Sequence, residues 1–111
     1  MFLTTPEKAG ELSRDAAIRI RILGFGLART ELAYMPQAPV PAAAIALKQA
    51  GLEIAAMDAV KTHNPFALND IIFSRETGID VMTMNNFGCS LIWGHPQGPT
   101  GLRSIIELIE E

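Results

Sequence analysis

The residues best suited to chemistry in this sequence are its two histidines, His63 and His95. Both lie where an expected strand gives way to a loop or helix, which is where α/β folds place ligands and catalysts. An imidazole at such a place could serve as a catalyst near neutral pH. The alternative is that each histidine only caps its own loop or lies on the surface.

The segment around His95 has features of a ligand-binding loop. Pro96 favours an extended backbone at His95. Gly94 and Gly98 remove side chains from the loop, so a substrate could approach the backbone closely. A helix expected to begin near Thr100 would direct free amides and a positive dipole toward the same loop. These features strengthen the hypothesis of a site at His95.

The surrounding pattern predicts alternating strands and helices. Isoleucines at 18, 20 and 22 alternate with arginines at 19 and 21, which is typical of a half-buried strand. We expect strands at 2–4, 18–25, 58–62 and 81–84, and helices at 6–12, 41–50 and 65–77 and after residue 100. Gly51 and Gly78 are placed to end two of these helices. The alternation predicts an α/β fold with mainly parallel strands.

Composition excludes several classes of protein. With 111 residues, 49% hydrophobic and 19% charged, the chain is expected to form one globular domain or less. A net charge of −3 argues against a nucleic-acid partner, and a single cysteine excludes an internal disulfide and suits a reducing cytoplasm. No signal peptide is recognised. The most apolar stretch, 42–57, is interrupted by polar residues and is not expected to cross a membrane.

Several ordered motifs resemble those of one enzyme family. The run 88–101, Gly-Cys-Ser-Leu-Ile-Trp-Gly-His-Pro-Gln-Gly-Pro-Thr-Gly, resembles the thiolase signature Gly-Gly-x-x-x-x-Gly-His-Pro-x-Gly-x-x-Gly. The upstream sequence resembles the thiolase order of helix, strand and Asn-Glu-Ala-Phe box, at residues 46–52, Asp58 and residues 63–67. Residues 22–26 and 39–42 also lie at the positions expected for this family. The resemblance covers nearly the whole chain and implies the carboxyl-terminal part of a thiolase-superfamily enzyme.

The resemblance implies roles for both histidines. His95 matches the family histidine that activates the nucleophilic cysteine and donates to the thioester oxygen. His63 falls on the Asn of the Asn-Glu-Ala-Phe box, Asn64 on its Glu and Phe66 on its Phe. A histidine there is similar to the His-Asp-Cys-Phe of sterol-carrier-linked thiolases and to the two histidines of ketoacyl synthases. His63 is therefore expected to donate a second hydrogen bond to the oxyanion.

Other residues are assigned by the same comparison. The expected substrate-binding residues are Met35, near a family methionine that lines the acyl pocket, with Phe66, Asn64, Gly94 and Gly98. Cys89 matches the second Gly of the signature, so it is expected to be a small packing residue and not the nucleophile. No metal site is expected.

The implied fold is an α/β, thiolase-like half-domain over residues 1–111. Its mixed, mainly parallel sheet should carry helices on both faces and be incomplete at both ends. The nucleophile-bearing amino-terminal half and the final Cys-x-Gly segment are expected to be absent from this chain. Glutamates 110 and 111 at the negative end of the last helix fit either fraying or a chain that continues.

The implied function is acyl transfer between coenzyme A thioesters, by carbon–carbon bond formation or thiolysis, in lipid metabolism. The chain would supply oxyanion-binding histidines and would be inactive alone. A thiolase-like retro-aldolase subunit and a noncatalytic assembly domain of a split thiolase are the alternatives. Expected partners are acyl-CoA, an amino-terminal thiolase half and further copies of the chain, in the cytoplasm, with coenzyme A thioester as substrate and no covalently bound cofactor.

Overall fold

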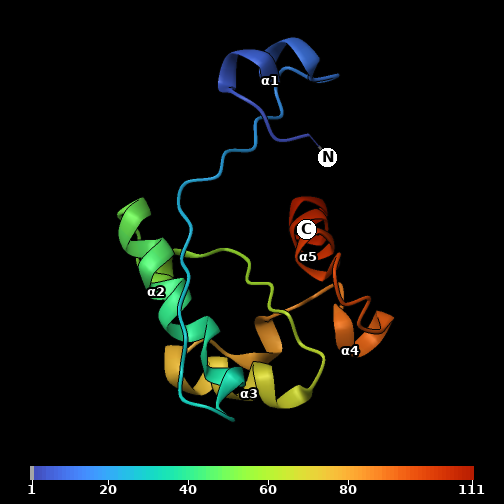
Figure 1. The fold of residues 1–111 in the computed structure, drawn as a ribbon. Helices are drawn as coiled ribbons and strands as arrows, with labels where there is room; N and C mark the ends of the chain where they lie inside the picture. Colours follow the sequence, from blue (N-terminus) through green and yellow to red (C-terminus); the bar gives the residue numbers. More distant parts are fainter. Residues whose placement is uncertain (1) are drawn as a thin grey trace.

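The structure is a computed structural model that describes residues 2–111. It contains helices α1 (Pro6–Leu12), α2 (Pro39–Ala50), α3 (Ala67–Thr77), α4 (Ser90–Trp93) and α5 (Thr100–Glu110), with 3-10 turns η1 (Met35–Gln37), η2 (Ile54–Ala56) and η3 (Val81–Thr83). Helix α1 stands apart, and an extended segment connects it to the rest while running beside α2 (Figure 1). No helix among the described residues is long and apolar enough to cross a bilayer.

The helix ends follow the local sequence. The Thr5 hydroxyl accepts a hydrogen bond from the Lys8 amide at 3.4 Å and caps α1. Gly51, with φ 68°, ends α2, and Gly78, with φ 80°, ends α3. Both are in the left-handed conformation that ends a helix and favours glycine. The predicted carboxyl-terminal ends of α2 and α3 are confirmed, although α2 begins two residues earlier than expected, at Pro39, and α3 two residues later, at Ala67.

The predicted sheet is not formed within residues 2–111. The only pairing of strand type there is an isolated parallel bridge between Val60 and Met84. The expected strands at 2–4 and 18–25 have no ladder partner, and residues 81–83 form η3 because the Asp80 carboxylate accepts a hydrogen bond from the Met82 amide at 2.9 Å. The mixed sheet covered by helices on both faces is therefore corrected to one bridge between extended segments.

The extended segment lies directly on α2. A Cβ atom at Gly24 would come within 2.5 Å of the Ala46 carbonyl oxygen, and one at Gly26 within 1.9 Å of the Ala42 carbonyl oxygen. Between them, the Phe25 amide donates to Gln49 Oε1 at 3.1 Å. Glycine is required here by the close approach of two backbones.

The interior of the described residues is mostly polar. The buried apolar residues are Phe73, Met84 and Cys89, whereas the buried polar residues are Thr62, Asn64, Asn69, Asp70, Asn85, Ser90 and Thr100. The radius of gyration is 14.9 Å, against roughly 13 Å for a compact domain of this length. Many large apolar side chains, including those of 18–27 and α4, are exposed. This chain therefore presents an apolar surface that its own residues do not cover.

Candidate functional site

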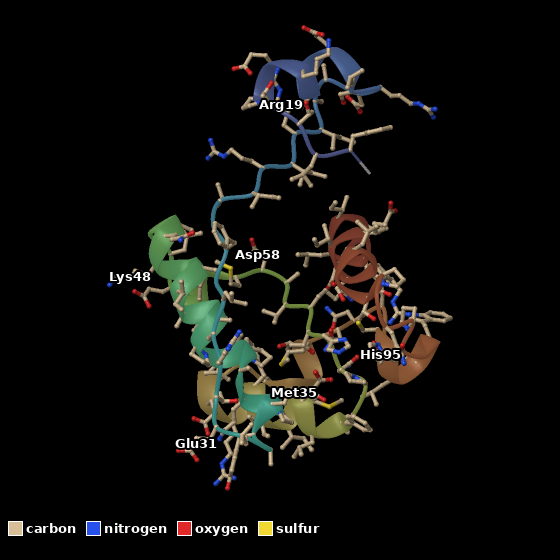
Figure 2. The ribbon with its side chains drawn as sticks, viewed as in Figure 1. Arg19, Glu31, Met35, Lys48, Asp58 and His95 are labelled. Carbon is tan, nitrogen blue, oxygen red and sulfur yellow. The ribbon has the colours of Figure 1, made fainter. Side chains whose placement is uncertain are left out.

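The structure brings the two histidines together. The ring centroids of His63 and His95 lie 4.5 Å apart with the planes tilted by 57°. Their segments meet because Val60 bridges Met84 and because the Asn85 amide donates to the Val60 carbonyl oxygen at 3.0 Å. Both rings remain exposed, so an incoming ligand could reach them. His95 lies beside the short helix α4 (Figure 2).

One nitrogen of His95 is occupied by its own loop. Nδ1 lies 2.9 Å from the Thr100 hydroxyl, and the Gln97 amide donates to the same atom at 3.3 Å. A backbone amide can only donate, so Nδ1 is the acceptor. The neutral ring then carries its proton on Nε2, which makes Nε2 a hydrogen-bond donor.

An arginine ties the His95 loop to α5. Arg103 donates from Nη1 to the Gly94 carbonyl oxygen at 2.8 Å and from Nη2 to the Ser90 hydroxyl at 3.1 Å. Its Nε lies 3.4 Å from Glu107 Oε1, within the same helix. The rigid guanidinium thus holds both ends of α4, immediately before His95.

His63 is held through its two neighbours. Thr62 and Asn64 are buried, and their side chains donate to the Asp70 carboxylate, Asn64 at 2.6 Å. Partial desolvation of the ring, then the adjacent His95 and the Arg103 guanidinium, lower the pKa of His63 below its ordinary value. His63 is therefore held mainly in its neutral form near neutral pH.

The other predicted site residues are placed differently. Gly94 has φ 83° and open space around it, and Gly98 also faces open space but has no conformation that requires glycine. Phe66 is exposed at the start of α3, and Met35 is exposed on η1. Asn64 is only 2% exposed, so it faces the interior instead of a bound substrate.

Cys89 has the packing environment that was predicted for it. Its side chain is fully buried, with Sγ 3.4 Å from the Ser104 hydroxyl. Its backbone has φ 111° and ψ −148°, a region that is favourable almost only for glycine. Within residues 2–111, no three His, Cys, Asp or Glu side chains gather so that they could hold a metal ion.

Asp70, Asn85 and Arg103 were not recognised from the sequence as parts of this site. Of the three, only Asp70 could have been found from the sequence. It is an acidic residue within the apolar stripe of its helix, and a buried acidic residue normally has a specific partner. Asn85 and Arg103 contact residues 23 and 13 positions away, and nothing in the neighbouring sequence indicates these contacts.

Comparisons with known proteins show the family of this chain. Residues 16–111 match the family described as thiolase, C-terminal domain, so the chain belongs to that family. It is 37% identical over 116 residues to a 3-ketoacyl-CoA thiolase of Vibrio vulnificus strain YJ016, covering 99% of this chain and 30% of that protein. It is 29% identical over 107 residues to the acetyl-CoA acetyltransferase of Escherichia coli K12, covering 96% of this chain and 27% of that one.

The fold is likewise thiolase-like. The crystal structure of human mitochondrial 3-ketoacyl-CoA thiolase matches with a TM-score of 0.75 and 33% identity, over 79% of this chain and 22% of that one. The chain spans less than a third of the length of these relatives. The similarity therefore describes one part of a thiolase.

Proposed function

We propose that this chain is the carboxyl-terminal part of a thiolase-like acyl-CoA acyltransferase, in which His95 and His63 donate hydrogen bonds to the thioester oxyanion. The pairing of the two rings at 4.5 Å carries the proposal. Two donors that serve one developing charge must each come within about 3 Å of it, which requires rings this close. The occupied Nδ1 of His95 leaves its Nε2–H free for that purpose.

The chemistry needs groups that this chain does not supply. A cysteine thiolate attacks the thioester carbon, the carbonyl oxygen becomes an oxyanion, and its collapse expels the coenzyme A thiolate to leave an acyl-enzyme. A base removes an α-proton from a second acyl-CoA, whose carbanion takes the acyl group and releases the cysteine thiolate; thiolysis runs these steps in reverse. We propose that the nucleophile belongs to an amino-terminal thiolase half, as the nucleophile-bearing part of the parent enzyme. Within residues 2–111 the single thiol is buried, which supports this division.

Finer features belong to the same proposal. The His63-Asn64-Pro65-Phe66 sequence supports placement near the sterol-carrier-linked thiolases, since their box also begins with histidine. Residues 1–111 would form a partial C-terminal domain, and the bridge between Val60 and Met84 would begin the parallel sheet that the remaining chain completes. Met35, Phe66, Gly94 and Gly98 would border the acyl-CoA. A cytoplasmic homo-oligomer without a covalent cofactor is the expected form.

Co-expression with an amino-terminal thiolase half tests the function. Restored thiolysis of a 3-ketoacyl-CoA is expected, and His95→Ala should lower kcat by about 10²- to 10³-fold because one oxyanion donor is lost. Glu31→Gln, at an exposed position labelled in Figure 2, is the matched control and should leave turnover unchanged. Release of an aldehyde or ketone would indicate a retro-aldolase, and tight binding without turnover would indicate an assembly domain.

A further inference from the structure

A buried carboxylate lies at the centre of the polar interior. Asp70 is 8% exposed and stands in the first turn of α3. Its Oδ1 accepts hydrogen bonds from the Thr62 hydroxyl and, at 3.2 Å, from the Asn85 amide, while its Oδ2 accepts from Asn64 Nδ2 at 2.6 Å. Two segments, residues 62–64 and the loop at Asn85, thus donate to one side chain of α3. We name these four residues, Thr62, Asn64, Asp70 and Asn85, the Asp70 cluster.

We propose that Asp70 is the positioning residue that sets the mutual orientation of His63 and His95. His63 lies between the two residues whose side chains donate to Asp70, so its backbone is held on both sides. Asn64 then extends the connection, because its Oδ1 accepts from the amide of Leu91 in α4 at 3.4 Å. Helix α4 leads into Gly94 and His95. One carboxylate is therefore linked to both rings.

The cluster requires an acceptor at position 70 for a definite reason. Thr62 already accepts from Asn85 Nδ2 at 2.8 Å, so its own hydrogen must point to Asp70. The backbone amide of Thr62 donates to Asn85 Oδ1 at 2.8 Å. The oxygen of the Asn85 side chain therefore faces Thr62, and its NH2 group faces Asp70. Asn64 also presents its NH2, since its oxygen faces the Leu91 amide. All three partners donate, and only a carboxylate accepts on both oxygens.

The pattern makes an exchange of donor and acceptor possible. In Asp70→Asn, the new amide nitrogen faces a donor, which leaves a buried pair unsatisfied. In the double variant Asn64→Asp with Asp70→Asn, the carboxylate at 64 can accept from both the Leu91 amide and the amide at 70. The oxygen at 70 can then still accept from Thr62 and Asn85. The double variant keeps every donor paired and should restore the cluster.

The test is nuclear magnetic resonance of the two imidazoles in the free chain, which needs no substrate. Wild type should show a nuclear Overhauser contact between the rings and a His63 pKa below its ordinary value. Asp70→Asn should lose the contact and bring the His63 pKa back toward that value, and the double variant should recover both. Asp58→Asn, an exposed carboxylate outside the cluster, is the matched control and should change neither.

Two results would overturn the inference. One is an Asp70→Asn chain with the ring contact and the His63 titration unchanged. The other is a double variant that does not regain the ring contact, because re-pairing the donors and acceptors of the Asp70 cluster should be enough to restore it. This holds whether or not the double variant folds. Should Asp70→Asn alone unfold, recovery in the double variant still supports the inference.

The effect on turnover rests on the proposed function and is read separately. In the co-expressed enzyme, Asp70→Asn should lower kcat by on the order of 10²-fold with little change in KM, since misplaced groups lose transition-state contacts first. Suppose that Asp70→Asn loses the ring contact, but that the wild-type chain co-expressed with the amino-terminal half shows no thiolase activity. This result would refute the proposed function and leave the positioning role of Asp70 intact. Normal kcat in a variant that has lost the contact would refute the histidines' joint role.

Discussion

The ring of His63 lies 4.5 Å from the ring of His95, so protonating both at once brings two positive charges together. Partial desolvation is the largest cause of the lowered pKa of His63, followed by the charge on His95 and then on Arg103. The unfolded chain, with a histidine pKa of about 6.5, therefore binds this proton more readily than the folded chain. The associated stability is present above that pH and is lost as the pH falls through the folded pKa.

We expect His95→Asn to raise the pKa of His63 only part of the way to its ordinary value. The substitution removes one neighbouring charge but leaves the desolvation, which is the larger cause. A pH titration of the His63 ring proton by nuclear magnetic resonance measures this directly. Glu31→Gln is the matched control, and an unchanged His63 titration in His95→Asn would contradict the assigned causes.

The pH dependence of stability should follow the same histidine. Between neutral pH and pH values below about 6.5, the free energy of unfolding of the wild type should decrease more steeply than that of His63→Gln. Urea unfolding at a series of pH values gives both curves. Parallel curves would show that His63 has the same proton affinity in the folded and unfolded chain.

In the co-expressed enzyme, His63→Asn should retain more activity than His63→Ala. Asparagine is the residue of the ordinary thiolase box at this position, and its amide can still donate a hydrogen bond, whereas alanine cannot. The loss in His63→Ala should approach the 10²- to 10³-fold expected for one oxyanion donor. Equal kcat for the two variants would argue that His63 does not donate to the reacting oxygen.

Cys89 should resist thiol reagents in the folded chain. Its side chain is fully buried, so modification requires at least local opening of the structure. Reaction with a chromogenic disulfide should be slow in native buffer and rapid in denaturant, and acetyl-CoA should leave no acetyl group on this residue. Rapid native labelling, or acetylation detected by mass spectrometry at a catalytic rate, would contradict the packing role.

Gly26→Ala should destabilise the chain by about 1–3 kcal/mol, as forced overpacking does. The added methyl group would meet the carbonyl oxygen of Ala42, a backbone atom that cannot move aside freely. Gly101→Ala in α5 is the matched control, because nothing lies near its Cβ and alanine favours the helix. Thermal unfolding of both variants decides the matter, and equal midpoints would mean that the segment does not rest on α2.

The chain alone should associate in solution. Its exposed apolar side chains on 18–27 and α4 exceed what a monomer of this size normally leaves uncovered. Sedimentation velocity should show dimers or larger species whose fraction rises with concentration, and an added amino-terminal thiolase half should reduce it. A clean monomer at high concentration would oppose this expectation.

Local signals determined the parts of this protein that depend on neighbouring residues. Thr5 and Pro6 determine the start of α1, Gly51 and Gly78 the ends of α2 and α3, and the ordered motifs the family. Caps and left-handed glycines act within a few residues, so the sequence alone suffices to place them.

The extended segments show where local reasoning stops. The alternating isoleucines of 18–25 predict a strand, yet a strand exists only when another segment pairs with it. Within residues 2–111 only Val60 and Met84 pair, and the 18–25 segment rests on α2 through its glycines instead. At 81–83 a single carboxylate, that of Asp80, turns an expected strand into η3.

For the candidate site, too, the sequence indicated the residues and the tertiary structure determined their arrangement. Residue types and the family motifs pointed to His63 and His95, but no local rule relates the orientation of two rings so far apart in sequence. Their 4.5 Å separation follows from the Val60–Met84 bridge and from the contacts of Asp70 and Arg103, which join segments that meet only after folding. Buried polar groups must find partners wherever the fold supplies them, and only the tertiary structure decides which partners those are.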